Sequence, residues 1–250
     1  MRGKLVAGNW KSNGNLAANE QLLEQVRTAA AGLKRAACAV CVPFPYLSQT
    51  HELLEGSNVA WGAQDVSHYA AGAYTGAVTA AMLREFGCRY VIVGHSERRS
   101  IFGESNAVVA AKCVQAIDER LTPIVCVGET LQERESGEME KVVGAQLDAV
   151  MAAPGKTLEH AVIAYEPVWA IGSGKTASPE QAQAAHVFIR TRVAGHDAAI
   201  ASKLTILYGG SVKAANAAQL FAMPDIDGGL IGGASLVAEE FMAICRAAER

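Results

Sequence analysis

Residues 122–151, TPIVCVGETLQERESGEMEKVVGAQLDAVM, contain one complete strand-and-helix unit. The first seven, residues 122–128, are an apolar and largely β-branched run, which predicts a buried strand. Thr130 and Glu133 then form a Thr-x-x-Glu capping box, which predicts that a helix begins there and runs over residues 131–151. A strand without polar alternation, followed by a helix, is typical of a parallel sheet covered on both faces.

The same unit recurs along the chain. Another helix is predicted after Ser105, where apolar residues repeat at helical spacing. A further one is predicted after Ser178, because Pro179 suits the first helical position and Gln181 completes a second capping box. The predicted strands cover residues 4–9, 36–42, 58–63, 89–94, 122–128, 161–166, 204–209 and 227–232.

Eight such units in 250 residues, with no linker between them, predict one domain over residues 1–250, folded as a closed (β/α)8 barrel. An open, doubly wound sheet is the alternative, because the pattern alone does not show closure.

The composition narrows the function classes. The formal net charge of −3 gives no electrostatic reason to expect nucleic acid as a partner. No apolar stretch approaches 18 residues and the first ten residues lack a signal-peptide core, so we expect no membrane segment and a cytoplasmic location.

Cys38 and Cys41 form a CxxC within a predicted strand, where they lie roughly 10 Å apart, beyond the reach of a disulfide. We expect all six cysteines to be reduced.

Polar residues follow several of the predicted strands directly. They are Asn9 and Lys11 after the first strand, Gln64 and Asp65 after the third, His95, Ser96 and Glu97 after the fourth, and Glu166 at the end of the sixth. In a barrel, the C-terminal ends of all strands meet on one face around the axis. Each residue alone has a structural explanation, such as a solvated lysine or a capping histidine. Together on one face they predict an active site.

Glycine pairs close the last two predicted strands, Gly209-Gly210 in YGGSVK and Gly232-Gly233 in IGGASL. Glycine lets the backbone approach a ligand closely, and the amides at the start of a following helix favour an anion. The loops after strands seven and eight of a barrel frequently bind phosphate, and Ser211 adds a hydroxyl donor. A small phosphorylated substrate is therefore predicted, with ordinary turn geometry as the alternative.

Three short motifs point to other functions and fail on spacing. GSGKT at 172–176 resembles the end of a P-loop, but Trp169 stands where that motif needs its first glycine. Residues 172–177 also match G-x-G-x-x-A, yet they do not follow a strand directly. HELLE at 51–55 has Glu55 in place of the second histidine of a zinc motif. We expect no metal and no nucleotide cofactor.

The residues on this face suit the removal of a proton next to a carbonyl and its return to the neighbouring carbon. The Glu166 carboxylate takes the proton, a neutral His95 imidazole hydrogen-bonds the carbonyl oxygen, and Lys11 stabilises the developing negative charge. An enediolate formed in this way loses its phosphate when water reaches it, so the site needs a lid. Residues 167–177 follow the base directly and combine an apolar tip with glycines at 172 and 174.

The chain resembles the triosephosphate isomerase family over essentially its whole length. The motifs are GNWKSNG at 8–14, VIVGHSERR at 91–99, AYEPVWAIGSGKTA at 164–177, YGGSV at 208–212 and GGLIGGASL at 228–236. The resemblance implies a TIM barrel that interconverts dihydroxyacetone phosphate and glyceraldehyde 3-phosphate without a cofactor.

The resemblance also implies roles for individual residues. Glu166 is the base, His95 the electrophile and Lys11 the charge-stabilising group, while Asn9 places Lys11 and the substrate oxygens. The implied phosphate-binding residues are Gly172, Ser211, Gly232 and Gly233. Residues 167–177 match the lid, Glu97 is the polar neighbour of Lys11, and Cys126 is a buried cysteine that supports the packing.

The family further implies a homodimer, in which the loop around Thr75 inserts beside the partner's active site. Here Tyr74 stands for the usual phenylalanine and Ala77 for a glutamate, a change that removes a carboxylate expected to pair with Arg98. Ser12 likewise replaces a larger apolar residue.

Two other function classes stay open at this stage. The first is a barrel that binds phosphate without catalysis, which binding of a triose phosphate without its interconversion would indicate. The second is nucleotide hydrolysis, which magnesium-dependent ATP turnover would indicate.

Overall fold

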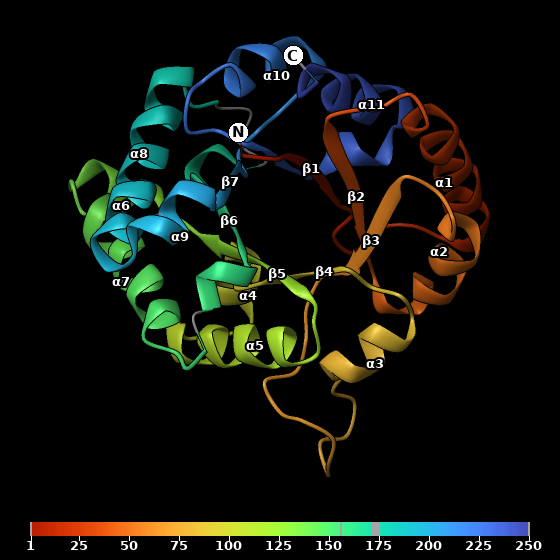
Figure 1. The fold of residues 1–250 in the computed structure, drawn as a ribbon, viewed down its shortest axis with the longest axis horizontal. Helices are drawn as coiled ribbons and strands as arrows, with labels where there is room; N and C mark the ends of the chain where they lie inside the picture. The colour runs from red at the N-terminus through yellow and green to blue at the C-terminus, as the bar shows by residue number, and fades with distance from the viewer. Residues whose placement is uncertain (1, 156, 172–175, 250) are drawn as a thin grey trace.

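The strands close into a parallel barrel in the computed structural model, which describes residues 2–155, 157–171 and 176–249 (Figure 1). The strands are β1 (Lys4–Asn9), β2 (Ala36–Val42), β3 (Val59–Ala63), β4 (Tyr90–Val93), β5 (Thr122–Val127), β6 (Val162–Tyr165), β7 (Thr205–Tyr208) and β8 (Gly228–Ile231). Each pairs with the next in chain order, and β8 pairs with β1 in a register that joins Leu5 to Gly228. The predicted (β/α)8 barrel is confirmed, and the open-sheet alternative is wrong.

Helices surround the barrel on its outside (Figure 1). They are α1 (Leu16–Ala30), α2 (Leu47–Leu54), α3 (Ala80–Glu85), α4 (Ser96–Ile101), α5 (Asn106–Asp118), α6 (Leu131–Glu135), α7 (Met139–Met151), α8 (Pro179–His196), α9 (Ala198–Lys203), α10 (Ala214–Phe221) and α11 (Ala238–Ala247). Short 3-10 turns are η1 (Phe44–Tyr46), η2 (Thr157–His160), η3 (Val168–Ala170) and η4 (Gly233–Leu236).

The helix predicted over residues 131–151 is two helices. The capping box at Thr130 and Glu133 forms as expected and starts α6, but α6 ends at Glu135. Gly137 then adopts a left-handed backbone with φ of 75°, and α7 begins at Met139. A left-handed glycine just after the last turn is a common way for a helix to end. The helices predicted after Ser105 and Ser178 are both confirmed, and each serine caps its helix.

Several strands are one residue shorter at each end than predicted. The fourth, predicted over 89–94, is β4 over Tyr90–Val93, and the sixth, predicted over 161–166, is β6 over Val162–Tyr165. At the end of β4, Gly94 has a φ of 67°, so the chain leaves the extended conformation there. The residues just beyond the strands are free to turn toward the barrel axis.

The core has two parts, as the two-sided burial of the strands requires. One fills the inside of the barrel and contains Leu5, Ala7, Ala39, Cys41, Tyr90, Ile92, Ile124, Cys126, Val162, Ala164, Leu207 and Leu230. The other lies between the strands and the helices and includes Tyr165, Ile189 and Tyr208. The six cysteines are free and buried.

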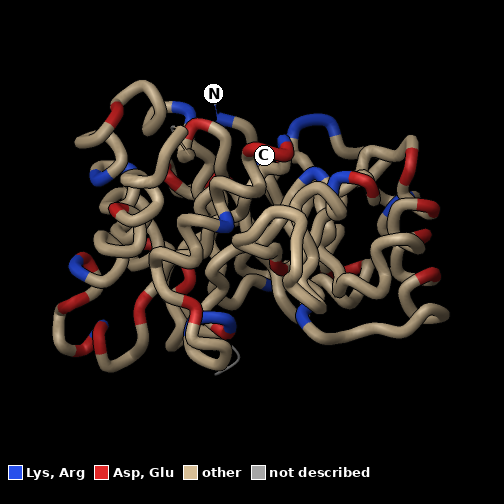
Figure 2. The backbone as a smooth tube through the Cα atoms, turned by 90° about the horizontal axis from the view of Figure 1, so that it is seen from below, with Lys and Arg blue, Asp and Glu red and all other residues tan. Residues whose placement is uncertain are grey.

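The surface charges are mixed. Figure 2 shows Lys and Arg interspersed with Asp and Glu along the tube. The segment between β3 and α3, residues 64–79, projects away from the barrel (Figure 1). Within the described ranges, none of the helices has the length and apolar character needed to cross a membrane.

Candidate active site

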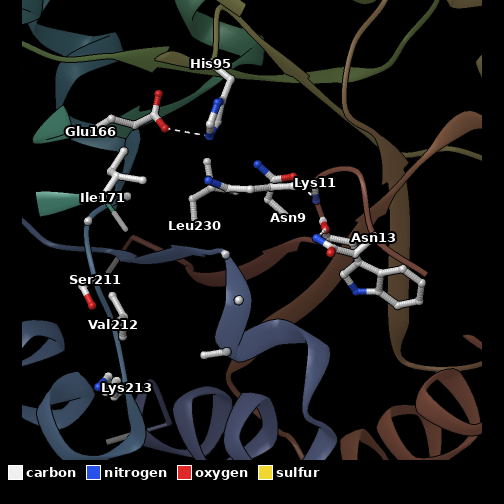
Figure 3. A pocket seen from close by; sticks show the side chains of 16 residues that line it. Asn9, Lys11, Asn13, His95, Glu166, Ile171, Ser211, Val212, Lys213 and Leu230 are labelled. Atoms are coloured by element: carbon white, nitrogen blue, oxygen red, sulfur yellow. Dashed lines mark hydrogen bonds and ion pairs between the residues drawn. The ribbon is translucent and has the colours of Figure 1, made fainter. Parts of the chain in front are cut away.

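A cavity of about 310 Å³ opens at the C-terminal ends of the strands. Its lining residues are Asn9, Trp10, Lys11, Asn13, His95, Glu166, Ile171, Gly209, Gly210, Ser211, Val212, Lys213, Leu230, Gly232, Gly233 and Ala234. In Figure 3 the Glu166 and His95 side chains point toward each other, and Lys11 extends into the space beside them. The structure therefore brings together Asn9, Lys11, His95, Glu166 and the described phosphate-site residues. Gln64, Asp65 and Glu97 line a neighbouring cavity instead, which also borders Lys11.

Glu166 comes directly after β6 and is almost fully buried, with 2% of its surface exposed. Its backbone N–H donates to the carbonyl of Val127 at 2.7 Å, which ties it to the end of β5. Its carboxylate accepts a hydrogen bond from the backbone N–H of Ser96 at 2.9 Å and one from the Ser96 hydroxyl at 3.4 Å. One carboxylate oxygen also lies 2.9 Å from Nε2 of His95. The predicted base is thus held in contact with the predicted electrophile.

His95 is the cap residue of α4, and its Nδ1 accepts a hydrogen bond from the backbone N–H of Glu97 at 3.2 Å. An accepting Nδ1 carries no proton, so in this geometry the ring is neutral and its Nε2–H donates to Glu166. Burial lowers the pKa of His95, but the Glu166 and Glu97 carboxylates outweigh burial and hold that pKa above its ordinary value of 6.5. The raised pKa favours a protonated ring, whereas the hydrogen bond accepted by Nδ1 requires a neutral ring with its proton on Nε2. We assign the neutral ring, because the contact with the Glu97 N–H leaves no room for a proton on Nδ1.

Lys11 has a left-handed backbone, with a φ of 53°. This conformation costs a residue with a side chain on the order of 1–2 kcal/mol. The Asn9 side-chain oxygen accepts the Lys11 backbone N–H at 3.0 Å and so holds the turn. The Lys11 ammonium lies 2.5 Å from a carboxylate oxygen of Glu97. Backbone strain of this kind is concentrated at functional sites, and here it turns the lysine side chain into the cavity.

The opposite side of the cavity is formed by the segments after β7 and β8. Ser211, Gly232 and Gly233 all line it, as the sequence predicted for a phosphate site. A Cβ at Gly210 would overlap the hydroxyl oxygen of Tyr208, so only glycine fits there. Gly233 begins the 3-10 turn η4 rather than an α-helix. The fourth predicted phosphate residue, Gly172, lies outside the described residues.

The first part of the predicted lid contacts Glu129, which follows β5. The Glu129 side chain is fully buried and accepts hydrogen bonds from the hydroxyl of Tyr165 at 2.9 Å and the indole N–H of Trp169 at 3.0 Å. The backbone N–H of Val168 donates to the Glu129 carbonyl at 3.1 Å. Burial raises the pKa of this carboxyl, although the indole and phenol donors act in the opposite direction. Within the lid, Ile171 reaches the cavity, and residues 172–175 lie outside the described ranges.

Sequence reasoning missed some of these residues. Glu129 was not singled out, although a glutamate directly after a buried strand was a signal. Ser96 was placed at the site but given no role, and the structure makes it a donor to the base. Asn13 and Lys213 line the cavity without having been named, and Lys213 follows the YGGSV motif at once.

The loss of a carboxylate at position 77 does not leave Arg98 without ion-pair partners. Arg98 forms ion pairs with Asp65 at 2.8 Å and Glu104 at 2.6 Å, within the same chain. A carboxylate at position 77 is therefore not needed to pair this guanidinium. The Tyr74 ring stacks on Tyr69 with ring centres 4.1 Å apart, which orders the projecting loop. The homodimer itself stays a prediction.

Comparisons with known proteins agree with this geometry. A family model described as "Triosephosphate isomerase" matches residues 4–248. The chain is 65% identical over 251 residues to a protein named triosephosphate isomerase from Thiobacillus denitrificans, with both chains covered completely. Proteins of the same name from Nitrosomonas europaea and Cupriavidus taiwanensis are 60% and 62% identical, over 99% and 98% of this chain and 99% of each relative. The chain belongs to the triosephosphate isomerase family.

Proposed function

We propose that this barrel interconverts dihydroxyacetone phosphate and D-glyceraldehyde 3-phosphate, as the names of its relatives indicate for them. The observation that carries the proposal is the contact between a buried carboxylate and a buried imidazole beside a cavity of about 310 Å³. Nε2 of His95 and the Glu166 carboxylate lie 2.9 Å apart on one side of that cavity.

The reaction needs a base for a carbon-bound proton, and Glu166 supplies it. Its carboxylate takes the proton from the carbon next to the carbonyl, the electron pair moves to the carbonyl oxygen, and an enediolate forms. A proton then moves from the hydroxyl of the first carbon to the former carbonyl oxygen. Glu166 returns its proton to the former carbonyl carbon, which completes the exchange of ketone and aldehyde. Glu166 is 2% exposed, so its carboxylate meets the substrate without a full shell of water.

His95 and Lys11 act on the negative charge. The Nε2–H of His95 donates to Glu166 here, and we propose that the substrate carbonyl oxygen takes over this hydrogen bond and releases the base. A neutral donor suits an oxygen whose charge grows during the reaction. The Lys11 ammonium, paired with Glu97, adds electrostatic stabilisation from the other side of the cavity.

We propose that the phosphate is held by the residues after β7 and β8. Ser211 supplies a hydroxyl, and Gly232 and Gly233 leave the backbone open to an anion. Gly232 lies close to the lysine, because a Cβ built on it would be 3.6 Å from the Lys11 side chain. Gly172 would contribute from the lid. Neither a metal nor a nucleotide is needed for these steps.

We also propose that residues 1–250 act as one domain in the cytoplasm and that the protein is a homodimer joined through the loop around Thr75. Nucleic acid and membranes are not expected partners. The loop projects beyond the barrel, and its Tyr69–Tyr74 stack supports a preformed shape for docking (Figure 1).

The test is a coupled assay of triose phosphate interconversion, run in both directions with a chelator present and no nucleotide. The proposal predicts turnover in both directions. A sample that bound a triose phosphate but did not interconvert the isomers would instead identify the alternative, a non-catalytic phosphate-binding barrel.

A further inference from the structure

A buried histidine outside the cavity packs directly behind the base. His186 lies on α8 and has no exposed surface. Its Nδ1 is 3.1 Å from the backbone carbonyl of Asp225. Because a carbonyl only accepts, this contact places the proton on Nδ1. Its Nε2 has no hydrogen-bond partner among the described residues.

The ring of His186 touches two tyrosines of the barrel wall. It meets the Tyr165 ring edge to face, with centres 5.9 Å apart and planes at 84°, and it lies 6.4 Å from the Tyr208 ring. Tyr165 and Tyr208 are opposite each other in the register of β6 and β7. Their side chains therefore leave the barrel on the same face, and His186 packs against both.

Chain connections and hydrogen bonds link these two tyrosines to residues of the candidate active site. Tyr165 directly precedes Glu166, and its hydroxyl donates to Glu129, the residue that also binds Trp169 of the lid. The Tyr165 carbonyl accepts the backbone N–H of Gly209 at 2.7 Å.

Tyr208 reaches the same region from the next strand. Its hydroxyl occupies the space that a side chain at Gly210 would need. A displacement of either ring would therefore be transmitted to the base, to the lid attachment or to the glycine pair.

We propose that His186 is a positioning residue for the isomerisation, whose ring holds Tyr165 and Tyr208 and through them fixes the base and the attachment of the lid. The inference rests on the proposed function of Glu166. The ring of His186, and not only its hydrogen bond to Asp225, holds the two tyrosines in place.

The surroundings keep this ring neutral. Burial lowers the pKa of His186 to about 4, and the nearby cations Arg190 and Lys4 act in the same direction, while the Asp225 carbonyl and carboxylate oppose them. Arg190 donates to both Asp225 and Asp227, so these carboxylates are already paired. An unpaired buried nitrogen destabilises the fold, so an apolar filler would pack here at lower cost. The histidine contributes more than volume, namely a hydrogen bond to the Asp225 carbonyl and a ring that packs against the two tyrosines.

The experiment compares His186→Asn, which keeps a side-chain donor near the Nδ1 position but loses the ring, with His186→Phe, which keeps a ring but loses the donor. Val193→Ala is the matched control, because Val193 is fully buried on the same face of α8, seven residues farther along. Four quantities are measured on each folded variant: kcat and KM for the triose phosphate, the amide exchange rate of residues 168–171, and Tm.

We expect His186→Asn to lower kcat about 10-fold with little change in KM, because a small misplacement of reacting groups costs rate before affinity. Its amides at 168–171 should exchange faster than in the wild type, while His186→Phe stays near the wild type in both respects. Val193→Ala should lower Tm without either effect. If His186→Asn does not fold, His186→Leu replaces it, because leucine leaves no buried polar atom.

Two results would overturn the inference. In one, the ring-deleted variant and Val193→Ala lower Tm alike and keep wild-type kcat and lid exchange, so that His186 is only structural. In the other, His186→Phe is as impaired as His186→Asn, so that the ring is not the acting part. Failure of the proposed function gives a different result, because the wild-type protein would then not interconvert the triose phosphates. The amide exchange of the lid residues could still be measured and compared between the variants.

Discussion

Replacing Lys112 by methionine should strongly destabilise this barrel. Lys112 lies on α5 with 4% of its surface exposed, and its ammonium is 2.5 Å from both Asp65 and Glu104. Arg98 pairs with the same two carboxylates. Without Lys112, two mostly buried carboxylates share one guanidinium. Breaking a buried ion pair from one side costs about 3–5 kcal/mol, which corresponds to a fall in Tm of roughly 6–20 °C for a chain of this size.

The assay is thermal unfolding followed by circular dichroism at one fixed protein concentration, because a dimer would make Tm depend on concentration. Lys141→Met is the matched control: Lys141 pairs with Glu138 at 2.8 Å, but its side chain is 78% exposed. This control should not shift Tm measurably, because solvent screens an exposed pair. A Tm of Lys112→Met equal to that of the control would refute the reasoning that the Lys112 network is buried and mutually dependent.

Three further outcomes follow from the site and its supports. Lys11→Met should lower kcat/KM by about 10²–10³-fold, because it removes a cation aimed at the enediolate; steady-state kinetics on a folded sample checks this, and a change below twofold would contradict it. Glu129→Gln should weaken the lid attachment by about 1 kcal/mol, because charge-assisted hydrogen bonds become neutral ones; hydrogen exchange should then be faster at Trp169, and an unchanged rate would argue against the attachment. Although burial opposes the effect, hydrogen bonds from Arg190 help to lower the pKa of Asp225 below its ordinary value of 3.8. The stability from this carboxylate is therefore present above pH 3.8 and lost as the pH falls through the lowered value, so Asp225→Asn should flatten the acid limb of the Tm profile.

The barrel and the main site residues were predictable because their signals are local. Each strand is an apolar run, and the residue after it belongs to the catalytic face whatever the tertiary details are. Asn9, His95 and Glu166 could be placed on one face by this rule alone. The family motifs then gave them roles. The break at Gly137 was also local, but the helical pattern on both sides of that glycine concealed it.

The remaining features depend on contacts between distant parts of the chain. Glu129 anchors the lid only because Tyr165 and Trp169, 36 and 40 residues away, converge on it. The left-handed backbone of Lys11 is a local exception, because Asn9 two residues earlier holds it, yet the sequence shows that residue as an ordinary asparagine. His186 looks like any histidine on a helix until β6 and β7 bring their tyrosines to it. Pattern and spacing do not contain this information.

The most direct test of the central claim is the turnover of Glu166→Gln, measured with the affinity of the same sample for glycerol phosphate, which has a phosphate but no carbonyl. If Glu166 is the base, interconversion of the triose phosphates should fall by about 10³-fold, since the amide does not accept the carbon proton. Glycerol phosphate should bind nearly as tightly as to the wild type, because the residues after β7 and β8 are unchanged. Turnover within tenfold of the wild type, with intact binding, would remove Glu166 from the role of base and contradict the account.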